Sequence, residues 1–219
     1  MKLRALMDLF RQEVDDLTEP LLWRDAELID YANDAQNEAV RRARLLIDSS
    51  TAGICTLAFT TASGLLMLDP RVLFIRKARL AGQKPLLRMT LQDMEAQNPY
   101  WQDESVGRAR FFVTDFETGR LLLWPQPDTA GTLLLTVVRD PLLEMNDDQD
   151  TPEIAPRYHR ALRYWMLARA YGKQDSEAND PKKGAEALAL FEQEFGKKSA
   201  AIDEVWIARE QMAHDGSYG

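Results

Sequence analysis

The residues that most often carry out chemistry in proteins are few in this chain, and their spacing matches no familiar site. The two histidines are His159, which stands between Arg157 and Arg160, and His214 near the end of the sequence. Neither has a second ligand at a spacing that suits zinc. The single cysteine, Cys55, stands in an apolar run, so we interpret it as a buried thiol rather than a nucleophile. We therefore expect no catalytic residue, no cofactor and no metal site.

Acidic residues are plentiful, but they do not define a site either. Asp147, Asp148 and Asp150 stand close together, yet the segment lacks the central glycine and the final glutamate of an EF-hand loop. No glycine-rich phosphate-binding motif and no G-x-S-x-G motif occurs. A solvated acidic loop is the simpler interpretation. A hydrolase that uses carboxylates is the less favoured alternative, because no pair of acids is singled out.

Composition narrows the classes of protein further. The chain has 219 residues, 45% of them hydrophobic, and a net charge of −8, so it can bury a core but is poorly suited to wrapping around DNA. One cysteine excludes an intramolecular disulfide, which fits a reducing compartment. Acidic residues appear by position 8, unlike in a secretory signal, and no apolar run approaches the ~20 residues of a membrane span.

Helical periodicity dominates both ends of the chain. Apolar residues recur at steps of three and four over residues 2–17 and 22–47. Asp25 is placed to be the cap or a first-turn residue of the second of these helices, where its carboxylate can accept from free backbone amides. Proline at a first helical position predicts further helices that begin at Pro152, after Thr151 as the cap, and at Pro181.

The middle of the chain alternates with a period near two. Strands are expected at 54–60, 65–68, 72–80, 108–114, 120–124 and 132–139, with a short helix at 90–97. Residues 61–64 look like a hairpin turn between the first two strands. The sequence therefore predicts an α+β protein. Segments 1–50 and 151–195 form a helical bundle, 51–140 forms an inserted antiparallel β-rich domain, and 196–219 is a C-terminal extension that is flexible or docks on a partner.

Large apolar side chains at the ends of elements are the best indication of a partner surface, although packing at loop junctions is the alternative for those before residue 196. The candidate interface residues are Trp23, Trp101, Trp206, Ile207, Met212 and Tyr218.

An ordered set of short motifs resembles bacteriophage head-to-tail adaptor proteins, including the tail tubular gatekeepers. The longest is W-x-D-A-E-L-I-D-Y-x-N-D-A-Q-x-E-A-V at residues 23–40. The others are LDPRV at 68–72, PYW at 99–101, LWPQPD at 123–128, Tyr158-His159 and Ala170-Tyr171. The resemblance covers residues 1–195. Arg24 stands where the family has a serine or threonine cap, so Asp25 is expected to take that role.

The resemblance implies a structural role and no catalysis. Such adaptors form a homo-oligomeric ring of about twelve subunits between the portal protein and a tail or nozzle protein. Double-stranded DNA passes through the lumen during ejection without specific binding, and an acidic lumen would let it slide. The implied location is the head–tail junction of the virion, assembled in the host bacterial cytoplasm, with no membrane contact. Another neck component, such as a head-completion or tail-terminator protein, is the alternative.

Overall fold

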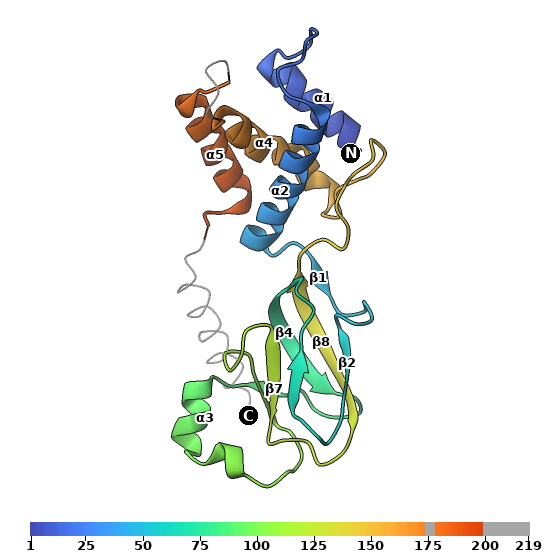
Figure 1. The fold of residues 1–219 in the computed structure, drawn as a ribbon, viewed down its shortest axis with the longest axis vertical. Coiled ribbons are helices and arrows are strands. Elements are labelled where there is room, and N and C mark those ends of the chain that lie inside the picture. Colours follow the sequence, from blue (N-terminus) through green and yellow to red (C-terminus); the bar gives the residue numbers. More distant parts are fainter. Residues whose placement is uncertain (174–177, 199–219) are drawn as a thin grey trace. The chain divides into compact units, whose positions relative to one another are not determined.

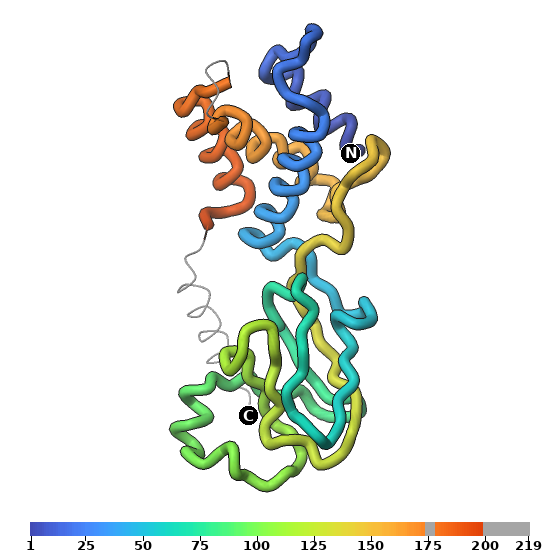
Figure 2. The backbone as a smooth tube through the Cα atoms, in the orientation of Figure 1, coloured from blue at the N-terminus to red at the C-terminus, as the bar shows by residue number. Residues whose placement is uncertain are grey.

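The computed structural model describes residues 1–173 and 178–198, and this part of the chain divides into two compact units (Figure 1). The helical unit comprises Met1–Leu46 and the described residues from Asp140 onward, and the β unit comprises Ile47–Arg139. In Figure 2 the backbone passes into the β unit in the cyan segment and returns in the yellow one. The chain is thus α+β with an inserted β-rich part, as predicted. The loop at 141–150, which the prediction assigned to neither part, belongs to the helical unit.

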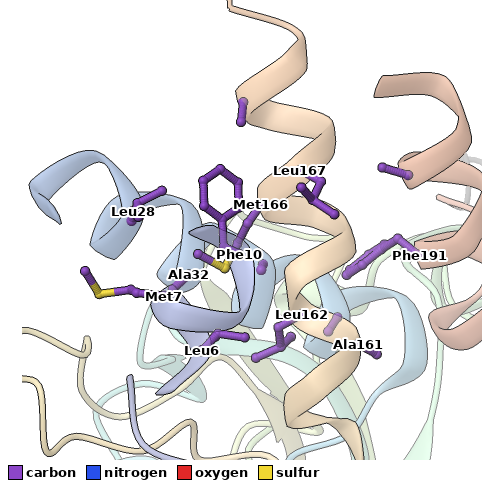
Figure 3. Close-up of a cluster of buried hydrophobic side chains, with 14 of the residues drawn as sticks. Leu6, Met7, Phe10, Leu28, Ala32, Ala161, Leu162, Met166, Leu167 and Phe191 are labelled. Atoms are coloured by element: carbon purple, nitrogen blue, oxygen red, sulfur yellow. The ribbon is translucent and has the colours of Figure 1, made fainter. Parts of the chain in front are cut away.

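The helical unit is built from both ends of the described chain. Its elements are α1 (Leu3–Val14), α2 (Asp25–Ala43), a 3-10 helix η2 (Pro156–Ala161), α4 (Leu162–Tyr171) and α5 (Pro181–Phe195). The apolar stripes of α1, α2 and α4 face one another, and Figure 3 shows the core that they share with α5. Ala32, Ala35 and Ala39 are completely buried along α2, so small side chains form the inner stripe of this helix.

A buried guanidinium connects α1, the following turn and α2. Arg11 donates to Asp16 at 2.5 Å, to the carbonyl of Trp23 at 2.8 Å and to Asp25 at 2.6 Å. Trp23 packs edge-to-face on Phe10, with ring centroids 5.4 Å apart. The turn between the helices is therefore fixed by charge-assisted hydrogen bonds and by an aromatic contact.

The starts of two helices can be compared with the prediction. Asp25 lies in the first turn of α2, one of the two positions predicted for it, but it is not the cap. Arg24 is the cap residue, and its amide donates to Glu27 at 3.2 Å, while the Asp25 carboxylate accepts from Arg11. Pro152 does not begin a helix. The amide of Glu153 instead donates to the side chain of Gln36 at 2.5 Å, and α4 begins ten residues later. Helical structure begins instead at Pro156, with the 3-10 helix η2 that leads into α4.

The β unit consists of two four-stranded sheets. In the first sheet, β8 (Gly131–Arg139) is central; β4 (Val72–Leu80) pairs along one side, and β1 (Ile47–Asp48) and β2 (Thr56–Phe59) share the other. In the second sheet the order is β3 (Leu65–Met67), β7 (Arg120–Trp124), β6 (Phe111–Val113) and β5 (Leu87–Arg88). All pairs are antiparallel except β5 with β6. A short helix, α3 (Leu91–Gln97), follows β5 and is capped by Thr90 as expected.

The turn predicted at residues 61–64 is present, because an antiparallel bridge joins Thr60 to Ser63. The two strands that it connects do not pair with each other: β2 pairs with β8 and β3 pairs with β7, so the chain crosses from one sheet to the other at this point. Gly64 permits the crossing, because a Cβ atom there would lie 2.7 Å from the carbonyl oxygen of Leu123. The strand at Val72–Leu80 is confirmed, but two bulges interrupt its pairing with β8. The second bulge lets Ile75 and Ala78, three residues apart, both point inward.

A buried ion pair closes the β unit where the chain enters and leaves it. Asp48 accepts from Arg139 at 2.6 Å, from the hydroxyl of Thr51 at 2.5 Å and from the amides of Ser50 and Thr51 at 2.9 and 3.1 Å. Burial alone would raise the pKa of Asp48, but these hydrogen bonds outweigh it and hold the pKa well below its usual range. Cys55 is buried as predicted, and burial raises the pKa of its thiol.

We predict that Arg11→Met lowers the free energy of unfolding by about 3 kcal/mol, because it leaves the buried carboxylate of Asp16 without its partner. Urea denaturation followed by circular dichroism at 222 nm would measure this loss. Arg4→Met is the matched control, since Arg4 is exposed and pairs only at the surface. Its effect should stay within about 1 kcal/mol. Equal effects of the two substitutions would contradict the importance of the buried network.

A second prediction concerns acid stability. Because folding lowers the pKa of Asp48, its contribution is complete above the usual aspartate range near pH 4 and declines as the pH falls below it. Asp48→Asn should cost about 3 kcal/mol at pH 7 and should reduce the further loss of stability between about pH 5 and 3. Urea titrations at a series of pH values, followed by tryptophan fluorescence, would show this. Asp103→Asn, at an exposed position, should keep the acid sensitivity of the wild type. The same sensitivity in Asp48→Asn would contradict the assignment.

Candidate interaction surfaces

Within the described residues, no group of three or more histidine, cysteine, aspartate or glutamate side chains could hold a metal ion. No helix of that part of the chain is long and apolar enough to cross a membrane. His159 is buried, its Nε2 lies 2.7 Å from the carbonyl of Ile154, and burial lowers its pKa. This histidine is part of the packing of the helical unit.

The loop at residues 140–150, which we call the acidic loop, is held on the surface of the helical unit by hydrogen bonds. Asn33 binds it from α2: the Asn33 side chain donates to the carbonyl of Met145 at 2.9 Å and accepts from its amide at 2.8 Å. The carbonyl of Asp150 accepts from the amide of Leu3 at 2.7 Å. The Asp150 carboxylate accepts from the amides of Asn146 and Asp147, which lowers its pKa. The loop conformation is thus fixed by both neighbouring helices and by its own turns.

The acidic loop presents an unusual combination of side chains to solvent. Leu143 is 82% exposed, the highest value among the large hydrophobic residues described. Glu144, Asp147 and Asp148 beside it are also exposed, and no cationic side chain of residues 1–173 or 178–198 pairs with them. A rigid loop that carries an exposed leucine amid unpaired carboxylates is suited to contact with a basic surface.

The β unit has a surface of the opposite character on the outer side of its first sheet. Register and alternation place side chains from three strands on this side. They are Thr56 and Ala58 of β2, Lys77 and Arg79 of β4, and Thr132, Leu134 and Thr136 of β8. None is acidic, and Lys77 and Arg79 are exposed. We call these seven residues the basic sheet face.

The C-terminal end of α5 is anchored by a buried arginine. The Arg42 guanidinium lies 5.2 Å from the ring centres of both Trp165 and Phe191, 3.6 Å from a carboxylate oxygen of Glu192, and donates to the carbonyl of Gly196 at 3.3 Å. These contacts combine cation–π and charge-assisted interactions. They fix the position on the helical unit from which residues 197 and onward continue.

The predicted interface residues have different surroundings. Trp23 is only 3% exposed and belongs to the core with Phe10, because the turn folds back over α1. It therefore contributes little to the exposed surface of its unit. Trp101 is half-buried and packs edge-to-face on Phe116, with ring centres 5.5 Å apart. Its neighbour Tyr100, which the sequence analysis did not select, is 76% exposed.

Four further candidates lie outside the described residues. These are Trp206, Ile207, Met212 and Tyr218. The sequence analysis recognised the acidic loop but gave it no role as a surface, and it did not identify the basic sheet face. The side of a sheet to which each strand residue points depends on strand pairing and on bulges, which the sequence does not show.

A pocket of about 240 Å³ lies in the β unit near the start of β8. Arg108 and Asp128 are the charged residues in its lining, and Arg108 already donates to Gln83 at 2.8 Å. The pocket is lined mostly by backbone and small side chains and brings no group of titratable residues together.

Comparison with known proteins identifies the family of the chain. The sequence model of the SU10 adaptor protein family matches residues 1–216, a span that includes the helical unit and the β unit alike. No curated protein matches the chain. Because the family match extends over nearly all of the 219 residues, the chain belongs to the SU10 adaptor protein family, whose members are phage head-to-tail adaptors with a structural role at the head–tail junction of the virion.

Proposed function

We propose that this adaptor forms a ring of about twelve copies between the portal and the tail or nozzle protein, and that DNA passes through the ring during ejection. The observation that carries the proposal is the family match over residues 1–216, which extends across both units. The chain's role in this proposal is to join partners, and no catalytic step and no cofactor is part of it.

The distribution of charge supports a ring around DNA. Residues 47–139 carry ten lysines and arginines and nine aspartates and glutamates, whereas the whole chain has a net charge of −8. The excess of negative charge therefore belongs to the helical unit and the C-terminal residues. An acidic surface toward the lumen would repel the phosphate backbone and let DNA slide without sticking.

The rival role is that of another neck component, such as a head-completion or tail-terminator protein. It shares the ring and differs in the partner bound. A hydrolase is the less favoured alternative. In the acidic loop, Asp140 pairs with Arg41, Asp150 is held by backbone amides, and Glu144, Asp147 and Asp148 lie open to solvent rather than facing one another across a cleft.

Light scattering tests the proposal directly. The adaptor would be measured alone, then mixed with the cognate portal, and in parallel with the tail protein. We expect the mass of the portal complex to rise by one adaptor per portal subunit. Binding to isolated tail protein with no binding to the portal would favour the rival role, and binding to neither would contradict both.

A further prediction concerns the C-terminal segment, which we propose docks on the portal. Deletion of residues 197–219 leaves in place the hydrogen bond from Arg42 to the carbonyl of Gly196, which anchors the end of α5. The truncated chain should keep its circular dichroism spectrum and thermal midpoint but lose portal binding. A double substitution, Trp206→Ala with Ile207→Ala, should weaken binding at least about tenfold, as expected for large apolar anchors. Full portal binding by the truncated chain would contradict this role.

A further inference from the structure

We propose that adjacent copies of the adaptor contact each other through the acidic loop of one copy and the basic sheet face of the next. This inference rests on the proposed ring and identifies the surfaces that close it. Each copy would offer both surfaces, so the contact is head-to-tail and can repeat around a closed ring.

The first argument is complementarity of charge. Glu144, Asp147 and Asp148 give the loop three exposed carboxylates without a described cationic partner. Lys77 and Arg79 give the sheet face two exposed cations that the described ion pairs do not use. The charges of the two surfaces are therefore opposite in sign.

The second argument is that both surfaces are held in place before they meet. Asn33 and the amide of Leu3 fix the loop, and pairing of β8 on both sides fixes the sheet face. Association therefore requires little ordering of backbone, which is one of the main costs of binding. The exposed Leu143 can lie against the apolar part of the sheet face, formed by Ala58 and the half-buried Leu134.

The third argument concerns the alternative ligand of a basic face, which is the phosphate backbone of DNA. Cations that bind phosphates hold DNA strongly at low salt. A ring would multiply two such cations by the number of subunits and would hinder passage of DNA. The acidic loop, in contrast, is a protein surface that every neighbouring copy presents.

Charge reversal in two separate variants tests this contact. Variant A is Lys77→Glu with Arg79→Glu, and variant B is Glu144→Lys with Asp148→Lys. All four positions are exposed, so the fold should tolerate each change. Asp147 is left intact because its carboxylate accepts from the amide of Gln149 at 2.9 Å. Variant A then has two acidic surfaces and variant B has two basic ones.

The measurement is the number of adaptor copies bound per portal, determined by native mass spectrometry. Variant A alone and variant B alone should assemble at least about tenfold less efficiently than wild type, since like charges meet at every contact. An equimolar mixture should restore full rings, because the acidic face of A meets the basic loop of B and the basic face of B meets the acidic loop of A. An even-numbered ring permits this strict alternation.

A matched control reverses two cations of the β unit that lie elsewhere. Lys84→Glu with Arg110→Glu changes the net charge as variant A does, at exposed positions outside the basic sheet face. This control should form full rings, and the thermal midpoints of all variants should stay within a few degrees of wild type.

The outcomes distinguish the proposed function from the proposed contact between neighbouring copies. If wild type fails to bind the portal, the proposed function fails. If wild type forms rings and either variant alone also forms full rings, the contact proposed here is overturned. Loss of retention on duplex DNA by variant A, with rings intact, would assign the basic face to DNA instead. Failure of the mixture to restore rings, when both variants are folded, would also overturn the proposal.

Discussion

The buried pair of Asp48 and Arg139 is the interaction on which the arrangement of the chain depends. A domain inserted into another must begin and end at neighbouring positions, and these two residues stand at those positions, in β1 and β8. Their ion pair is satisfied further by the hydroxyl and amide of Thr51. A buried ion pair stabilises the fold only while both partners are present. The pair therefore specifies which two ends of the β unit meet, rather than adding much to the overall stability.

The helical unit uses the same physical device. Arg11 joins α1 to α2 through Asp16, Asp25 and the carbonyl of Trp23, and Arg42 joins α2 to α5. In each case a planar guanidinium satisfies several acceptors from different segments. The apolar stripes provide most of the burial, while these arginines determine which segments meet. A rigid unit of this kind can present a loop such as 140–150 in one conformation.

For a structural virion protein, function depends on surfaces rather than on reacting groups. The described residues include an acidic loop, which the side chain of Asn33 holds, and a basic sheet face, which strand pairing holds. Contacts of this type are steered by electrostatics and weakened by salt. In the ring proposed above, the contact between neighbouring copies would therefore weaken as the salt concentration rises.

The sequence by itself determined the fold class, most helices and strands, and the absence of a recognisable reaction motif, because periodicity and the positions of proline and glycine act locally. It located β4 and α3 and identified Cys55 as buried. Only the tertiary structure decided that β2 and β3 belong to different sheets, that Asp25 binds Arg11, and that Trp23 lies in the core. Each of these depends on a partner distant in sequence, and the two bulges of β4 decide which charges share a face. Long-range pairing of this kind has no local signature, so the interaction surfaces could be assigned only after the chain was folded.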